Sequence, residues 1–129
     1  MGDKYYRFVV DGIGIYEAVD RDCPKTDSRR DEKPDGSWLE KAGKDYPGAI
    51  SYWTKEGLET YIFSGLLDWH ANVVKGSINV LIAENPKNIK YQDQHQIILD
   101  DFDIEIMDII GYEDFLQGDD ILPDDLQLF

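Results

Sequence analysis

The order of hydrophobic and polar residues predicts a strand followed by a helix at the start of the chain. Residues 5–10, YYRFVV, alternate between two sets of side chains with a period of two, which is typical of a strand. Arg7 is the charged member of this segment. Apolar residues spaced for one helical face over 13–22 then predict a helix, which Pro24 ends. The charged segment 24–36 has no period and is expected to form a loop.

A second strand is predicted in the middle of the chain, between helical segments. Ser37 and Glu40 have the spacing of a capping box, in which each side chain satisfies a backbone N–H at a helix start. A short helix is therefore expected to run from there through Ala42. Residues 49–53 are β-prone and follow a Pro-Gly turn, so they predict the second strand.

The second half of the chain changes from a helical to a strand pattern. Residues 54–73 carry apolar side chains at every third and fourth position, which predicts a helical stretch capped by Thr54. Ser64 and Gly65 are expected to divide it into two helices. Short strands are predicted after that, over 78–83, 89–92, 96–99 and 103–109.

This arrangement predicts an α+β fold in a single domain. The late strands are too close in sequence for helical crossovers, so the sheet or sheets should be mostly antiparallel, with five to six strands and two to four helices. We place the domain at residues 1–110. Residues 111–129 are expected to form an acidic C-terminal tail, which either docks as a helical turn or stays loose.

Charge is distributed unevenly along the chain, whose net charge is −14. Residues 1–90 hold all 13 Lys and Arg together with 15 Asp and Glu, whereas residues 91–129 hold 12 acids and no Lys or Arg. Such acidity repels nucleic acids and anionic membranes, so neither is expected as a partner. It serves solubility, the favoured explanation, or it attracts a basic protein partner.

Composition also bears on the compartment. No apolar run approaches the roughly 20 residues that span a bilayer, and the start of the chain lacks a basic segment followed by an apolar one. Cys23 is the single cysteine, so no internal disulfide is expected. We therefore expect a cytoplasmic protein.

Candidate chemical motifs are few. Gly12 and Gly14 lie between the first strand and the helix, where glycines can let backbone N–H groups reach a phosphate. Glu17 occupies the third glycine position of that fingerprint and disfavours an anion, so a simple turn is favoured. His70, His95 and Cys23 supply too few ligands for zinc and no helix N-terminus to activate the thiol.

Three carboxylates alternate with apolar residues over 101–105. On a strand, Asp101, Asp103 and Glu105 would share one face, and their oxygens suit Mg²⁺ or Ca²⁺. Alternation is also what any one-sided sheet requires, so a solvated face is the favoured interpretation and no metal site is predicted.

Aromatic residues flank the first two strands, namely Tyr5, Tyr6, Tyr46, Tyr52, Trp53 and Tyr61. Several should belong to the core, since large aromatic side chains are mostly buried. A pocket between the two strands could also stack a planar ring, and Arg7 could meet a phosphate or a ribose there.

The chain resembles small bacterial proteins without an assigned activity that carry a YRF…GIGIYEA start and a late YQD-type strand. Its layout more distantly resembles the ADP-ribosyltransferase fold, whose members split NAD at the nicotinamide–ribose bond. The resemblance places Arg7 at the family's first-strand arginine and Ser51 at the first residue of its Ser-Thr-Ser strand. Gln94, His95 and Gln96 fall on its Glu-x-Glu segment.

The resemblance implies a nucleotide site with NAD as a substrate and no tightly bound cofactor. Arg7 would hold phosphate or ribose, Ser51 would brace the pocket, and Tyr52 or Tyr61 would stack nicotinamide. Gln94 belongs to the same implied site, and Gln96 stands where the family has its catalytic glutamate.

Glutamine can keep a hydrogen bond to the ribose but carries no charge for the developing cation. Either the reaction is slow, or Asp93 or Glu84 takes the role, or the domain binds without catalysing. The alternative function is a non-enzymatic interaction protein whose acidic C-terminal region docks a basic partner.

Overall fold

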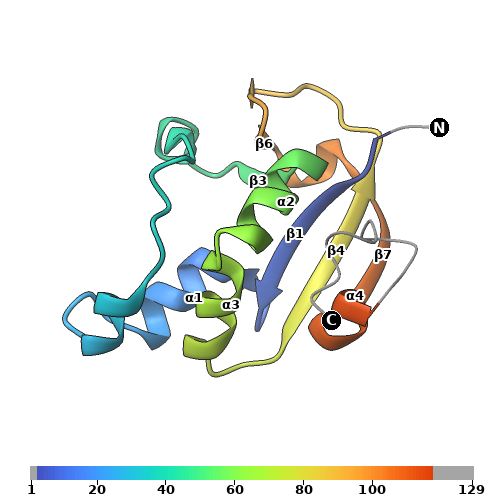
Figure 1. Cartoon of the computed structure of the whole chain (residues 1–129). Coiled ribbons are helices and arrows are strands. Elements are labelled where there is room, and N and C mark those ends of the chain that lie inside the picture. Colours follow the sequence, from blue (N-terminus) through green and yellow to red (C-terminus); the bar gives the residue numbers. More distant parts are fainter. Residues whose placement is uncertain (1–2, 118–129) are drawn as a thin grey trace.

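The structure is a computed structural model and describes residues 3–117. These residues form an antiparallel sheet of seven strands together with helices (Figure 1). The strands are β1 (Tyr5–Val10), β2 (Ile13–Gly14), β3 (Ile50–Trp53), β4 (Ile78–Glu84), β5 (Tyr91–Gln92), β6 (Gln96–Leu99) and β7 (Glu105–Gly111). The α-helices of this part are α1 (Ile15–Asp22), α2 (Lys55–Phe63), α3 (Leu66–Val73) and α4 (Tyr112–Gln117). Across the sheet the order is β5-β6-β3-β1-β4-β7, with β2 paired to β1. The predicted α+β class is confirmed.

The sheet gains a strand because residues 13–14 extend the hairpin of β1 instead of opening the helix. Asp11 and Gly12 have φ of 53° and 83°. Two successive positive φ values make the two-residue hairpin turn for which Asp-Gly is a strong signal. Val10 therefore faces Ile13 across the hairpin, and α1 begins only at Ile15. Gly12 is thus part of the turn, whereas Gly14 lies in β2.

The predicted capping box is wrong, whereas the predicted cap of α2 is confirmed. The Ser37 hydroxyl and backbone N–H both donate to the carboxylate of Asp35, two residues earlier, so residues 37–40 form a turn and not a helix. A 3₁₀ turn follows instead at Ala42–Asp45. Thr54 accepts from the Gly57 N–H at 3.0 Å, which is the expected N-cap bond.

The division of the helical stretch at Ser64-Gly65 is also confirmed. Gly65 has φ of 83°, a left-handed conformation that favours glycine and lets the chain turn between α2 and α3. Both helices pack on one face of the sheet, in front of β1 in Figure 1.

Two apolar clusters hold the sheet, one on each face. The helix-covered face buries the even-numbered side chains of β1 together with residues of all four helices. The opposite face buries a smaller cluster of Tyr5, Tyr52, Ala83, Ile97, Leu99 and Ile104. Strand alternation assigns side chains to these faces, so Tyr5 and Tyr6 belong to different clusters.

The shared strand face considered for Asp101, Asp103 and Glu105 does not form. Asp101–Asp103 form a 3₁₀ turn, so the three side chains do not line one strand face. Asp103 is buried and accepts from the side-chain amide of Asn88 at 3.1 Å. Within residues 3–117, no group of His, Cys, Asp or Glu is placed to hold a metal ion.

The packed domain continues past the expected boundary at residue 110. Phe115 of α4 is fully buried and meets the ring of Phe8 edge-on, with centroids 5.6 Å apart. The remainder of the predicted tail, residues 118–129, lies outside the described residues. Over residues 3–117 no helix has the length and hydropathy that a membrane span requires.

Candidate functional site

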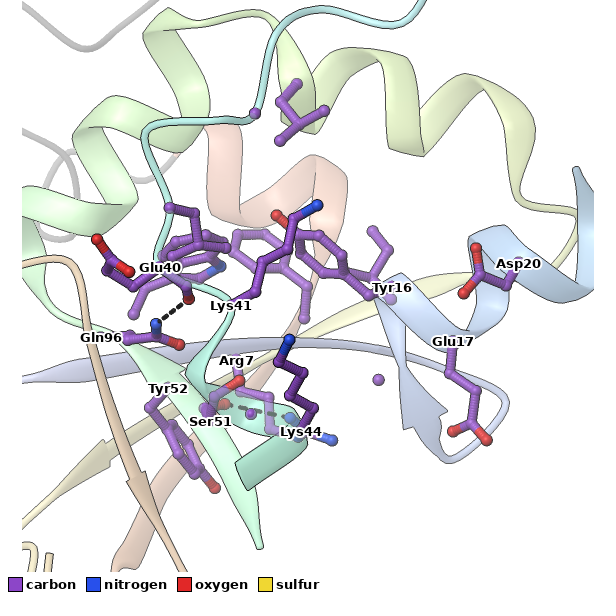
Figure 2. A pocket seen from close by; sticks show the side chains of 18 of the residues that line it. Arg7, Tyr16, Glu17, Asp20, Glu40, Lys41, Lys44, Ser51, Tyr52 and Gln96 are labelled. Atoms are coloured by element: carbon purple, nitrogen blue, oxygen red, sulfur yellow. Dashed lines mark hydrogen bonds between the residues drawn. The ribbon is translucent and has the colours of Figure 1, made fainter. Parts of the chain in front are cut away.

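A cleft of about 970 Å³ opens where β1 and β3 separate (Figure 2). The register pairs β3 with β1 at one position, Tyr6 with Trp53, while β2 pairs with the far end of β1. The edge of β1 between these two contacts therefore opens into the cleft. Residues of the segment 33–44 form the opposite wall.

Arg7 lies in this cleft with one hydrogen bond to the protein. Its Nη1 donates to the carbonyl oxygen of Ser51 at 3.1 Å, which links β1 to β3 where their pairing has ended. Among residues 3–117, no carboxylate lies within ion-pair distance of the guanidinium. Burial lowers the pKa of Arg7 below its usual value, since desolvation disfavours the charged form. The cleft thus holds a partly desolvated cation with unused donors.

The position of Arg7 depends on a close approach to β2. A Cβ added to Gly14 would lie 3.0 Å from Nη2 of Arg7. The second glycine of the GIG segment therefore leaves room for the guanidinium, although the backbone of Gly14 has an ordinary φ of −62°.

Gln96 also lines the cleft, and its side chain holds the opposite wall. Its Nε2 donates to the carbonyl oxygen of Glu40 at 2.8 Å (Figure 2). The backbone N–H groups of His95 and Gln96 both donate to Asp93, which orders the turn before β6. Gln96 is thus a structural link between β6 and the 33–44 segment.

Arg7, Ser51, Tyr52 and Gln96 all line this one cleft. A shared site for these four predicted residues needs that arrangement. The Tyr52 ring, however, belongs to the opposite-face core and points away from Gln96 and Tyr16 in Figure 2.

Two predicted site residues lie outside the cleft lining. Tyr61 is fully buried and bonds through its hydroxyl to His70 Nδ1 at 2.6 Å. Gln94 is exposed, and its carbonyl oxygen accepts from the Thr54 hydroxyl. Neither side chain is placed to touch a molecule in the cleft.

The alternative acids are not placed there either. Asp93 is engaged by the Tyr91 hydroxyl and by the backbone of the turn before β6. Glu84 pairs with Glu105 at the far end of β4. Carboxylates that do line the cleft are Glu17, Asp20, Asp35 and Glu40.

Two parts of the site were not predicted from the sequence. One is a set of lysines, Lys25, Lys33, Lys41 and Lys44, which with Arg7 gives five basic side chains against four acidic ones. The cleft is thus formally positive in a chain of net charge −14. These lysines come from aperiodic segments, where no spacing indicates that they converge.

The other missed residue is Tyr16, which is 42% exposed and lines the cleft from α1. Its ring meets His70 edge-on at 4.7 Å between centroids and lies 6.4 Å from Trp53. Tyr16 could have been found as an aromatic residue on the polar face of the predicted helix, since the apolar face of α1 is formed by Ile15, Ala18 and Val19.

Beneath Tyr16, the buried His70 should make stability depend on pH. Burial, assisted by the positive charges of Lys33 and Arg30 and opposed by Asp20, lowers the pKa of His70 to about 4. The unfolded chain binds this proton near pH 6.5, so the stabilisation is complete above that pH and is lost as pH falls toward 4. We expect a loss of about 3 kcal/mol across this window.

Urea unfolding at pH 7 and at pH 4.5 measures this loss, with His70→Asn as the comparison. Asparagine keeps a polar partner for Tyr61 but does not titrate, so the variant should be less stable at pH 7 and show a much flatter pH dependence. An equal pH dependence in both proteins would assign the effect to other groups.

Together, the fold and the cleft define a single α+β domain with a pocket at a split in its antiparallel sheet, lined by aromatic side chains and by five basic and four acidic ones. No protein-family model, curated protein or solved structure matches the chain.

Proposed function

We propose that this chain binds NAD or a related nucleotide in the cleft between β1 and β3. The observation that carries the proposal is Arg7, a desolvated guanidinium with one hydrogen bond to the protein and no carboxylate partner within residues 3–117. Partial desolvation of this charge is costly, and the carboxylates of Asp101 and Glu17 act on it only from beyond ion-pair distance, so an anionic ligand that bonds the guanidinium directly would compensate the cost.

The diphosphate is the part of a nucleotide that fits this charge. A guanidinium offers several N–H donors in a fixed fork that matches phosphate oxygens. Lys41 and Lys44 line the same cleft, so their ammonium groups would add attraction from the opposite wall. Ser51 would fix the orientation of the guanidinium through its carbonyl oxygen.

Tyr16 is the aromatic side chain best placed to stack a planar ring. It is partly exposed on the cleft wall, and its contact with His70 holds the ring in one orientation. We therefore propose Tyr16, in place of Tyr52 and Tyr61, as the residue that would contact nicotinamide or adenine.

We propose binding without catalysis. A transferase of the ADP-ribosyltransferase kind needs a carboxylate beside the ribose, and position 96 is a glutamine whose Nε2 is engaged by the carbonyl oxygen of Glu40. Its remaining amide oxygen could still accept a hydrogen bond from a ribose hydroxyl. Catalysis would need Glu17 or Glu40, the cleft carboxylates with the longer side chains, to reach the ribose.

Thermal unfolding with NAD, ADP-ribose and nicotinamide tests the proposal. Ligand at about 100 times its Kd stabilises a protein by about 2.7 kcal/mol, so NAD and ADP-ribose at millimolar concentration should raise the Tm by several degrees. Nicotinamide, which lacks the phosphates, should have little effect, and added salt should reduce the NAD shift. No shift with any of the three would refute nucleotide binding, and release of nicotinamide from NAD would refute binding without catalysis.

The proposal includes a cytoplasmic location. It is supported by Cys23, a free and fully buried thiol that takes no part in a disulfide. Cell fractionation with an antibody against the full chain checks it, and recovery outside the cytoplasmic fraction would contradict it.

A further inference from the structure

The strand β7 forms an edge of the sheet with unusual exposure (Figure 1). It pairs with β4 on one side, and within residues 3–117 no strand lies along its other side. Ile106, Met107 and Ile109 are 42%, 55% and 61% exposed, and none of its seven residues is Lys or Pro. Its protection against pairing consists of two acidic side chains, Glu105 and Asp108, and one bulge, and an open edge is a template for another strand.

The register separates charge from apolar surface across this strand. Ile106 and Ile109 pair with Ala83 and Leu81, so they lie on the sheet face that has no helices. The bulge at Met107 shifts the alternation, so Asp108 pairs with Ile82 and Glu105 with Glu84, toward the helix-covered face. One side of β7 is thus apolar and the other is acidic.

Neither carboxylate is neutralised within the described residues. Glu105 accepts from the side-chain amide of Asn85 at 2.7 Å, and Asp108 accepts from the backbone N–H of Ile109 at 2.9 Å. The second bond shows that the Ile109 N–H is within reach of an acceptor outside β4. Asp108 therefore covers an edge donor that an added strand could take over.

We propose that β7 is a docking edge for an extended segment of a basic partner protein, in which Lys or Arg residues alternate with apolar ones. Such a strand would pair with the outer edge of β7, set its apolar side chains beside Ile106 and Ile109, and set its basic ones beside Glu105 and Asp108. No residue of β7 lines the cleft between β1 and β3, so a test of this docking edge is independent of the proposed nucleotide binding.

The acidic charge around β7 favours a basic partner over a second copy of this chain and over its own residues 118–129. Residues 91–117 contain eight acids and no Lys or Arg. A second copy paired through β7 would bring Glu105 and Asp108 of both copies together, which is unfavourable. Residues 118–129 carry four further acids and no base, so the same repulsion applies to them.

A synthetic ten-residue peptide of alternating Lys and Val, labelled with fluorescein, tests the docking edge with the full chain. Fluorescence anisotropy should show binding that weakens with salt, and a peptide of the same composition with Lys and Val in two blocks should bind much more weakly. The charge reversals Glu105→Lys and Asp108→Lys together should reduce the affinity about tenfold or more. The reversals Glu113→Lys and Asp114→Lys on α4 change the net charge equally and should have a small effect.

Equal binding of the two peptides, or equal losses in the two double variants, would overturn the proposal in favour of general electrostatic attraction. Hydrogen exchange of the full chain distinguishes the other occupants. The Ile109 amide should exchange fast alone and slowly with the alternating peptide. Protection without peptide, or a concentration-dependent dimer that Asp108→Lys dissociates, would show that the chain itself covers this edge and would equally overturn it.

Discussion

Replacing Arg7 by methionine is expected to abolish stabilisation by NAD while leaving the ligand-free domain at least as stable as before. The guanidinium is partly desolvated, has no carboxylate partner within residues 3–117 and makes one bond, to the Ser51 carbonyl oxygen at the cleft. Methionine fills a similar volume without the desolvation cost, so the ligand-free Tm should stay level or rise. A rise would correspond to about 1 kcal/mol in the free energy of unfolding. The NAD-induced shift should disappear, because the charge that attracts phosphate is gone.

Differential scanning fluorimetry of both proteins, with and without NAD and ADP-ribose, measures the two effects together. Arg7→Lys is the matched control, since it keeps the charge but lacks the fork, and it should retain part of the shift. A ligand-free Tm that falls by several degrees in Arg7→Met would make Arg7 a structural link between β1 and β3. An unchanged NAD shift in that variant would remove it from the ligand site.

Gly57→Ala is expected to destabilise the domain by about 3 kcal/mol, the upper part of the usual range for overpacking. A Cβ at this position of α2 would overlap the carbonyl oxygen of His95, a backbone atom that cannot rotate away. That oxygen also accepts from the Thr54 N–H at 3.0 Å, so the start of α2 sits directly on the turn before β6. Glycine to alanine within a helix normally stabilises by up to about 1 kcal/mol, and the clash must exceed that gain.

Urea unfolding of Gly57→Ala and of Gly43→Ala gives the measurement and its control. An added methyl at Gly43 would meet no atom within 4 Å, so that variant should keep wild-type stability to within about 0.5 kcal/mol. The Gly57 variant should also lose NAD affinity, because the turn that it displaces carries Gln96 and its bond to Glu40. Equal stability of the two variants would contradict the close packing of α2 on His95.

Local signals predicted those elements whose cause is local. The cap at Thr54 and the break at Gly65 depend on neighbouring residues and backbone dihedrals, so their residue types predicted them. The helix expected from residue 13 was wrong at its start, because the Asp-Gly turn pairs Ile13 and Gly14 with β1 before α1 begins. The capping box at Ser37 failed because a nearer acceptor, Asp35, captured the serine hydroxyl and N–H. The strand expected over 103–109 began late because Asp101–Asp103 curl into a 3₁₀ turn.

The site was predicted less completely than the fold. Arg7 was identifiable as a charge on an apolar strand, and the resemblance added Ser51 and Gln96, which reach the same cleft. Tyr61 could not be excluded from sequence, because an aromatic side chain on α2 has the same pattern whether it faces the core or a cleft. Its burial against His70 is a property of the packed helices.

By itself the sequence determined the antiparallel α+β class, the strand that carries Arg7 and the concentration of acid after residue 90. Periodicity is a property of a few neighbouring residues, and composition is a property of the whole chain. Both can therefore be read without knowing which residues are in contact. Only the tertiary structure decided that β1 and β3 separate around Arg7, that lysines of an aperiodic segment face it, and that β7 lies at an edge. Those features depend on strand order and on contacts between distant residues, which no local pattern encodes.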